Sequence, residues 1–163
     1  TVDCQNADGS VDPGAPAQAA ANGFAANQSG AWYQPASSGQ GMLFDVRPAS
    51  ADGSDAGLLL GGWFTYDPAA AADDPTAQHW FLLQGDLAQA SAGSVEVPIY
   101  RVTGGRFDHN ATHNAHAVGY AQVQFSACDR GRLSYRFDST GLAGAFAGKQ
   151  GEIQLQRLSP CEP

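Results

Sequence analysis

The chain has 163 residues with 43% hydrophobic content, and its 8 basic and 16 acidic side chains leave a net charge of −8. This length and composition are typical of one folded domain and exclude a disordered chain. The acidic balance disfavours a nucleic-acid partner, because a phosphate backbone would be repelled, and no apolar run approaches the ~20 residues of a membrane-spanning helix.

The first 29 residues are predicted to form an N-terminal arm, followed by one β-domain at 30–163. Ala, Asn, Gly and Gln dominate the arm, and its few apolar residues follow neither a strand period nor a helix period. The chain starts abruptly at Thr1, as a mature product does after its signal peptide is removed. We therefore expect a secreted protein, either extracellular or periplasmic.

Three aromatic blocks predict the first strands of an antiparallel sheet. They surround Trp32, Trp63 and Trp80, which are all the Trp residues of the chain. Turn-forming residues separate the blocks, and in the segment 41–47 between them Met42, Phe44 and Val46 alternate with the other side chains. The predicted strands that follow Trp32 span 41–47, 58–66 and 78–84.

The second half of the chain continues with strands and turns. Pro98 lies inside an alternating segment and predicts an edge strand or a β-bulge, since proline cannot donate a ladder hydrogen bond. The clearest hairpin surrounds the turn at 128–131. The strands predicted in this half span 95–102, 118–127, 132–138 and 151–158.

The expected fold class is all-β, with seven or eight strands in one domain. Neighbouring strands usually pair in space, so the simplest topology is an antiparallel meander. About eight strands can close on themselves and remove the sheet edges, which predicts a closed or flattened β-barrel. A Greek-key β-sandwich is the alternative.

The chain has three cysteines, Cys4, Cys128 and Cys161, so at most one disulfide bond can form within it. We predict the pair Cys128–Cys161, with Cys4–Cys161 as the alternative, because the spacing alone does not decide between them. One thiol is left over in either case.

Two series of motifs resemble a family of secreted, largely uncharacterised proteobacterial β-rich domains. The first is Gly-x-Trp-Tyr-x-Pro-x-x-Ser-Gly-Gln-Gly at 30–41, followed by Trp-Phe-Thr-Tyr-Asp at 63–67 and the aromatic strand around Trp80. The second is Pro-x-Tyr-Arg-x-Thr-Gly-Gly-x-Phe at 98–107, followed by Gly-x-Leu-Ser-Tyr at 131–135. The resemblance covers roughly residues 29–158. It implies export and a β-rich fold, and it implies no activity.

Five aromatic side chains are the candidate surface for a ligand or partner: Trp32, Tyr33, Trp63, Tyr66 and Trp80. Adjacent residues of a strand face opposite sides, so neighbouring rings cannot all lie in the core. Outward rings can stack on a sugar or hold an apolar small molecule. The alternative is that the arm or a partner subunit covers them.

A histidine-rich loop is the candidate metal site. His109, His113 and His116 follow one another at spacings of four and three residues, and Asp108 precedes them. Imidazole and carboxylate groups suit zinc or copper. The alternative is a solvated polar loop, because this Asn-rich sequence disfavours the helical turn that would bring the side chains onto one face.

The expected function is that of a secreted, non-enzymatic module that binds a ligand or self-associates through exposed aromatic residues and the arm. The sequence contains no Gly-x-Ser-x-Gly motif of the kind that presents a nucleophilic serine. A glycosidase-type mechanism would need two carboxylates, and only residue type suggests the candidates Asp45, Asp67, Asp86 and Glu96. Two alternatives stay open. One is a metal-binding protein or metalloenzyme that uses the histidine loop, and the other is a barrel that binds a small apolar or sugar ligand.

Overall fold

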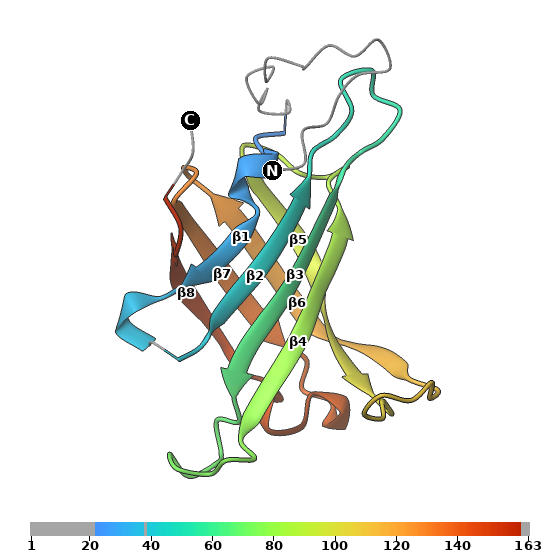
Figure 1. Ribbon diagram of the computed structural model, residues 1–163, viewed down its shortest axis with the longest axis vertical. Coiled ribbons are helices and arrows are strands. Elements are labelled where there is room, and N and C mark those ends of the chain that lie inside the picture. Colours follow the sequence, from blue (N-terminus) through green and yellow to red (C-terminus); the bar gives the residue numbers. More distant parts are fainter. Residues whose placement is uncertain (1–21, 38, 161–163) are drawn as a thin grey trace.

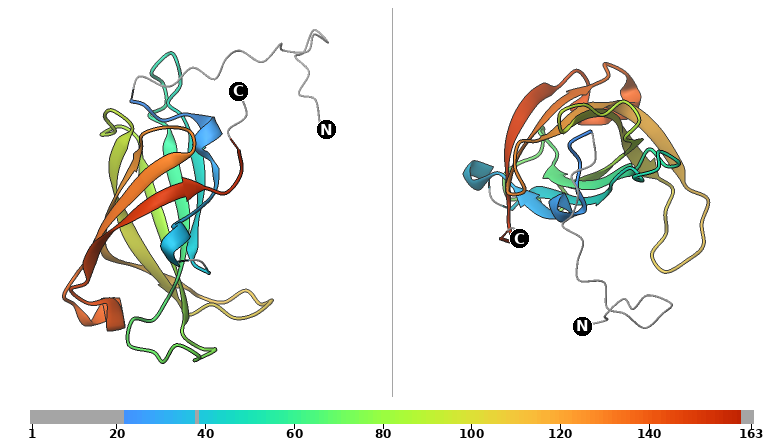
Figure 2. Two further views of the ribbon diagram at one scale, coloured as in Figure 1. Left: turned by 90° about the vertical axis from the view of Figure 1, so that its left-hand side faces the viewer. Right: turned by 90° about the horizontal axis from the view of Figure 1, so that it is seen from above.

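A computed structural model describes residues 22–37 and 39–160, which form a closed, eight-stranded antiparallel β-barrel (Figure 1). The strands are β1 (Gly30–Tyr33), β2 (Gly41–Arg47), β3 (Leu58–Tyr66), β4 (Gln78–Asp86), β5 (Ser94–Thr103), β6 (Asn114–Phe125), β7 (Arg130–Phe137) and β8 (Gln150–Arg157). Each strand pairs with the next, and β8 pairs with β1, so the strands form a ring when seen from above (Figure 2). The predicted closed barrel is confirmed, and the sandwich alternative is wrong.

Alternating side chains build the core of the barrel, because successive residues of a strand face opposite sides of the sheet. In β2, Met42, Phe44 and Val46 are buried inside, whereas Leu43 and Asp45 between them are exposed. The other strands continue this pattern, and their inward side chains form one hydrophobic cluster. Any binding surface on these strands is therefore built from their outward side chains or at the barrel ends.

The upper end of the barrel in Figure 1 is closed by the segment before β1, which includes the 3₁₀ helix η1 (Ala26–Gln28). Phe24 is fully buried, with its ring 5.7 Å from that of Phe125. The indole N–H of Trp32 donates to the carbonyl of Gln28 at 2.9 Å. Phe24, Ala25 and Gln28 are thus buried against the barrel, although they fall within the predicted arm of residues 1–29. Residues 1–21 of that arm lie outside the described residues.

Another 3₁₀ segment, η3 (Gly141–Phe146), closes the lower end. The Phe146 ring is buried there, 4.9 Å from the ring of Phe81 and 5.2 Å from that of Phe137. A third short turn, η2 (Pro35–Ser37), connects β1 to β2. None of the helical segments in the described ranges is long and apolar enough to cross a membrane.

The sheet is irregular beside Pro98. Strand β4 pairs with β5 through only two residue pairs, Leu82–Tyr100 and Leu83–Ile99. The register of β5 against β6 shifts between Ile99 and Tyr100. The predicted irregularity is confirmed at this place, where the proline nitrogen has no hydrogen to donate.

The barrel wall is least complete where β1 meets β8. Strand β1 has four residues and pairs with β8 at Trp32–Arg157 and Tyr33–Gln156. After Tyr33 the chain turns away from the wall into η2 (Figure 1). Within the described part of the chain, no strand therefore lies beside the first half of β8 on this side.

Candidate functional site

The lower ends of β3 and β4 form a groove on the outer surface, which we call the aromatic groove. Its volume is about 380 Å³, within the range of roughly 300–1,000 Å³ that is typical of ligand pockets. The residues that line it are Gly39, Phe64, Thr65, Tyr66, Gln78, His79 and Trp80.

Strand register places two large rings side by side in this groove. Phe64 of β3 is directly opposite Trp80 of β4, and both point outward because their neighbours Trp63 and Phe81 are buried inside. Phe64 is 47% exposed and Trp80 is 51% exposed. Neither ring packs against another aromatic ring of the described residues. About half of each side chain is therefore accessible to a ligand.

The loop between β1 and β2 forms one wall of the groove. The Tyr66 hydroxyl donates to the carbonyl of Gly39 at 3.2 Å, and the Thr65 hydroxyl donates to Oε1 of Gln40 at 2.8 Å. Gly39 has a φ of 92°, a backbone conformation that favours glycine. These contacts attach the loop to the end of β3 and orient the Tyr66 ring.

His79 borders the groove near the barrel end. Its Nε2 lies 3.8 Å from Oδ2 of Asp67, and its ring packs 5.3 Å from the Phe146 ring. Thr65 is opposite His79 in the register, but its hydroxyl bonds to Gln40 instead. No hydroxyl of the described residues bonds to His79, so this part of the chain forms no nucleophile–base pair around it.

The structure divides the five aromatic residues predicted to form a ligand surface. Tyr66 and Trp80 are exposed in the groove, and Tyr33 is half-buried in β1. Trp32 and Trp63 are 1% and 4% exposed, so the prediction is corrected for these two core residues.

Phe64 is the groove residue that the predicted set omitted. It directly follows Trp63, and the two-residue period of a strand requires it to face outward once Trp63 faces inward. Alternation alone predicts that one ring of each neighbouring pair faces outward. Which of the two rings this is depends on the register of the whole sheet.

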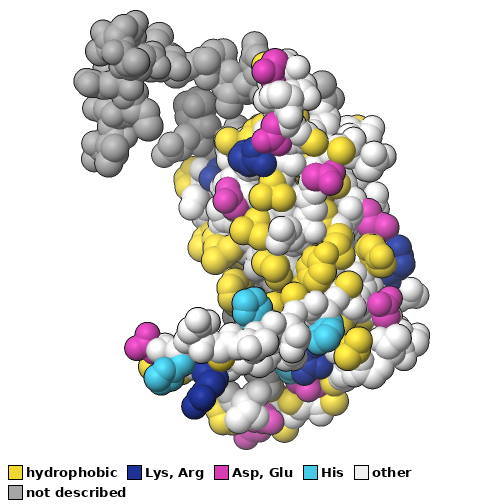
Figure 3. All heavy atoms as spheres, turned by 90° about the vertical axis from the view of Figure 1, so that its right-hand side faces the viewer, with side chains coloured by type: hydrophobic (Ala, Val, Ile, Leu, Met, Phe, Trp, Pro, Cys, Tyr) yellow, Lys and Arg dark blue, Asp and Glu magenta, His cyan; other side chains and the backbone are white. Residues whose placement is uncertain are grey.

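The outer surface has an apolar side and a polar side. Figure 3 views the molecule from the right-hand side of Figure 1 and shows hydrophobic side chains gathered across the middle of that face. Exposed Leu43 extends the apolar surface beyond the groove to β2, and half-buried Leu82 and Tyr100, which are directly opposite each other, extend it to β5. The apolar surface therefore spans several strands.

Strands β7 and β8 carry the polar side. Arg132 lies 3.4 Å from Glu152, and Arg136 lies 3.2 Å from Glu96 on β5. All four side chains are about half exposed, so these ion pairs contribute little to stability.

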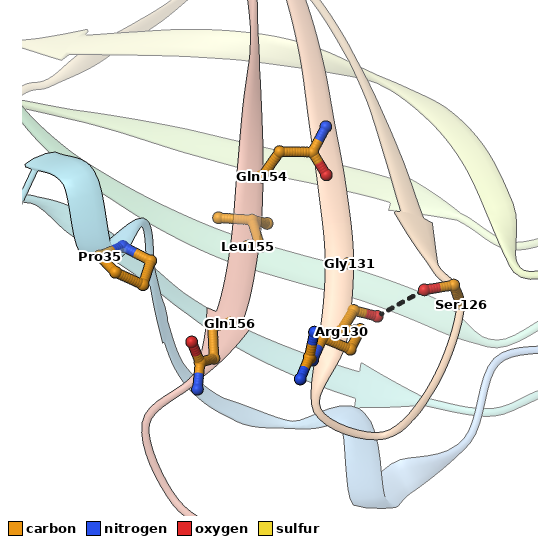
Figure 4. Close-up of a pocket in the computed structure, with 7 residues that line it drawn as sticks. All are labelled: Pro35, Ser126, Arg130, Gly131, Gln154, Leu155 and Gln156. Atoms are coloured by element: carbon orange, nitrogen blue, oxygen red, sulfur yellow. Dashed lines mark hydrogen bonds between the residues drawn. The ribbon is translucent and has the colours of Figure 1, made fainter.

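A second groove, also of about 380 Å³, lies where η2 approaches β7 and β8 (Figure 4). Pro35 lies across from Gln154 and Gln156 in this view, and Ser126 donates to the carbonyl of Arg130 at 3.4 Å. The lining residues are Pro35, Ser126, Arg130, Gly131, Gln154, Leu155 and Gln156. Few of these are apolar, so this groove suits polar contacts.

Beside this groove the backbone of β8 has an open edge. The Leu158 N–H donates toward β1, to the Ala31 carbonyl, whereas the Arg157 N–H donates to the Asp129 carbonyl on the β7 side. Because these directions alternate along an antiparallel strand, the backbone groups of Gln150, Glu152 and Gln154 also face the β1 side. In the described ranges no strand lies there to pair with them.

The histidine loop is not gathered into a site. Asp108, His109 and His113 are exposed on the β5–β6 connection, and His116 is half-buried in β6. Among residues 22–37 and 39–160, no three His, Cys, Asp or Glu side chains are grouped to hold a metal ion. The predicted zinc or copper arrangement is corrected, because β6 begins at Asn114 and removes the helical turn that the spacing requires.

Cys128 lies in the β6–β7 turn and is disulfide-bonded. Of the two predicted pairings, only Cys128–Cys161 includes this residue. Cys4 and Cys161 lie outside the described residues, so the identity of the partner stays a prediction.

Comparison with known proteins found no matching family model, no matching curated protein and no matching solved structure.

Proposed function

We propose that this chain is a secreted, non-enzymatic binding module whose ligand contacts the aromatic groove. The observation that carries the proposal is the outward pair Phe64 and Trp80, each about half exposed at neighbouring strand ends. Exposed apolar patches of this kind typically mark binding surfaces, because large rings left in water gain free energy when a ligand covers them.

The rigidity of the groove supports this proposal. Both rings stand on paired strands, and the Tyr66 ring is held by its bond to Gly39. A surface that is already ordered loses little conformational entropy when it binds a ligand, so more of the contact energy becomes affinity. The packed interior supports an outer site rather than a ligand cavity inside the barrel.

Export is part of the same proposal. The disulfide at Cys128 supports it, because disulfide bonds persist mainly in oxidising compartments such as the periplasm and the extracellular space. The resemblance to secreted bacterial domains points the same way.

Ligand mapping by NMR tests the proposal. We would titrate ¹⁵N-labelled protein with three probe sets: neutral oligosaccharides, tripeptides, and small indole and phenol derivatives. We expect the largest chemical-shift changes at the lower ends of β3 and β4, including the indole N–H of Trp80. The variant Trp80→Ala should lose these changes while keeping its fold, because the exposed ring contributes little to the core.

Tyr120→Ala is the matched control. Tyr120 is also an exposed aromatic residue, at 40%, but it lies on β6 with Arg136 over its ring. This variant should keep the shift changes in the groove. Changes spread evenly over the barrel, or centred elsewhere, would contradict the proposal.

Self-association through the open edge of β8 is a second candidate function. The edge presents unpaired backbone groups at Gln150, Glu152 and Gln154, and an extended segment of a second copy could pair with them. The predicted donor, the N-terminal arm, lies largely outside the described residues.

A proline at the edge tests this candidate. Gln154→Pro removes only the N–H that faces away from β7, so the barrel should fold while strand addition is lost. Sedimentation velocity in a reducing buffer should show larger species for the natural chain and for Gln154→Ala, and monomers for Gln154→Pro. A natural chain that stays monomeric at about 1 mM would rule the candidate out.

A further inference from the structure

We infer that the ligand of the aromatic groove is a neutral carbohydrate chain. This inference rests on the proposed binding function of the groove and names the chemistry of its ligand. It is carried by three properties of the groove: its charge, its combination of rings with free polar groups, and its open shape.

The groove is lined by residues without a permanent charge. Its lining includes no Asp, Glu, Lys or Arg, and the carboxylate of Asp67, outside the lining, lies 3.8 Å from His79. An anionic ligand would find no cation in the lining and would be repelled by the net charge of −8. A cationic ligand would find no carboxylate in the lining. The groove therefore fits a neutral ligand.

Polar groups without partners lie beside the exposed rings. Gln78 is exposed and directly opposite Tyr66, and its amide has no hydrogen-bond partner among the described residues. The indole N–H of Trp80 likewise has none in this part of the chain. A pyranose ring presents an apolar face of C–H groups and a rim of hydroxyl groups. It can stack on Trp80 or Phe64 while its hydroxyls bond to the amide and the indole.

The open shape of the groove distinguishes a sugar from other neutral ligands. A purely apolar molecule would keep one side in water, because the groove lies on the outer face of β3 and β4. A carbohydrate tolerates this, since its remaining hydroxyls stay solvated. An extended peptide would gain no backbone pairing here, because β3 and β4 are paired with each other along the groove.

The surrounding surface favours a chain over a single sugar. Exposed Leu43 and half-buried Leu82 continue the apolar surface away from Phe64. Further sugar units can cover these side chains in the same way. We therefore expect affinity to rise with chain length from two to six sugar units.

The closing experiment measures binding through Trp80, the one exposed Trp among the three in the chain. We would titrate the protein with the neutral hexasaccharides of cellulose, xylan, mannan and chitin, and with anionic hexagalacturonate. At least one neutral chain should change the Trp emission, whereas hexagalacturonate should not. Trp80→Phe removes the indole N–H and keeps an aromatic ring, whereas Trp80→Ala removes both. Because neither variant retains the reporting indole, calorimetry replaces emission for both.

The variants of Trp80 distinguish the contribution of ring stacking from that of the indole N–H. Trp80→Ala should weaken binding at least about tenfold, and Trp80→Phe should weaken it less, because a ring remains to stack. Tyr120→Ala, outside the groove, should change the dissociation constant less than about twofold. Circular dichroism would verify that each variant is folded.

Two results overturn the inference. One is the absence of binding for all four neutral chains up to about 5 mM, and the other is tighter binding of hexagalacturonate than of any neutral chain. If tripeptides or aromatic fragments still map to the groove by NMR, the carbohydrate inference fails and the binding function stands. If no probe maps to the groove, both fail.

Discussion

Trp63 and Phe64 are neighbours in the chain, yet their side chains have opposite environments. Trp63 is 4% exposed and packs 5.1 Å from the Tyr135 ring, whereas Phe64 is 47% exposed. Trp80 and Phe81 form the same kind of pair one strand later. At the scale of single residues, the site consists of those rings that the two-residue period places outside.

The loop between β2 and β3 contains a carboxyl group with an unusual pKa. The hydroxyl and the backbone N–H of Ser54 both donate to Oδ1 of Asp52, at 2.7 and 3.0 Å. These bonds stabilise the charged form and lower the pKa of Asp52 from 3.8 to about 2. The folded loop is therefore favoured fully above pH 3.8, and this preference is lost as the pH falls through about 2.

NMR titration of the Asp52 carboxyl should give a midpoint near pH 2. In Ser54→Ala the hydroxyl bond is lost, so the midpoint should move toward 3.8. Asp74 is the internal control, because Thr76 lowers its pKa independently and the variant should leave it unchanged. An identical Asp52 midpoint in both proteins would contradict this account.

The register of β6 against its neighbours depends on a glycine. The shift between Ile99 and Tyr100 brings Gly119 opposite Ile99 on one side, and Gly119 is opposite Phe137 on the other. A Cβ atom at Gly119 would lie 2.2 Å from the Arg136 carbonyl oxygen and 2.8 Å from the Phe137 Cα. Strands β6 and β7 can approach this closely only because residue 119 has no side chain.

Gly119→Ala should therefore lower the free energy of unfolding by about 1–3 kcal/mol, because backbone atoms have to move. Gly105→Ala is the matched control, since a Cβ there meets nothing within 4 Å. It should change stability by less than about 1 kcal/mol. Urea denaturation would measure both, and equal midpoints for the two variants would show that the close approach is not a constraint.

At the scale of the whole molecule, closure of the strand ring also fixes which strands carry the apolar and the polar parts of the outer surface. The ring of strands leaves the first half of β8 unpaired where β1 is short, and helical segments cover both ends. The apolar outer side and the polar outer side then lie on different strands of the same ring. A closed barrel with two such sides presents one apolar surface to a ligand and stays solvated elsewhere.

The closure of the upper end predicts a large effect of a residue outside the strands. Phe24→Ala should lower the free energy of unfolding by about 3–5 kcal/mol, because it leaves a cavity beside Phe125. Phe107→Ala should change it by less than about 0.5 kcal/mol, since Phe107 is 97% exposed. Thermal or urea unfolding compares the two. Similar stabilities would mean that residues 24–28 are not part of the cooperative core.

The strand pattern was predictable where side chains alternate without interruption. The predicted spans 41–47 and 58–66 match β2 and β3. The predicted start of the sixth strand at residue 118 was four residues late, because β6 begins at Asn114. Residues 114–117 contain no large apolar side chain that would indicate a buried face, and their pairing with β5 holds them in the sheet.

The amino-acid sequence by itself determined the all-β class, the order of the strands and the presence of aromatic pairs, because these follow from local periodicity and from neighbouring strands pairing. Tertiary structure alone decided which ring of each pair faces outward, since that depends on the register of the closed sheet. It also decided that Phe64, Tyr66 and Trp80 share one groove and that His109, His113 and His116 do not share a metal site. Such groupings join residues distant in the chain, and only cross-strand pairing and ring closure bring them together.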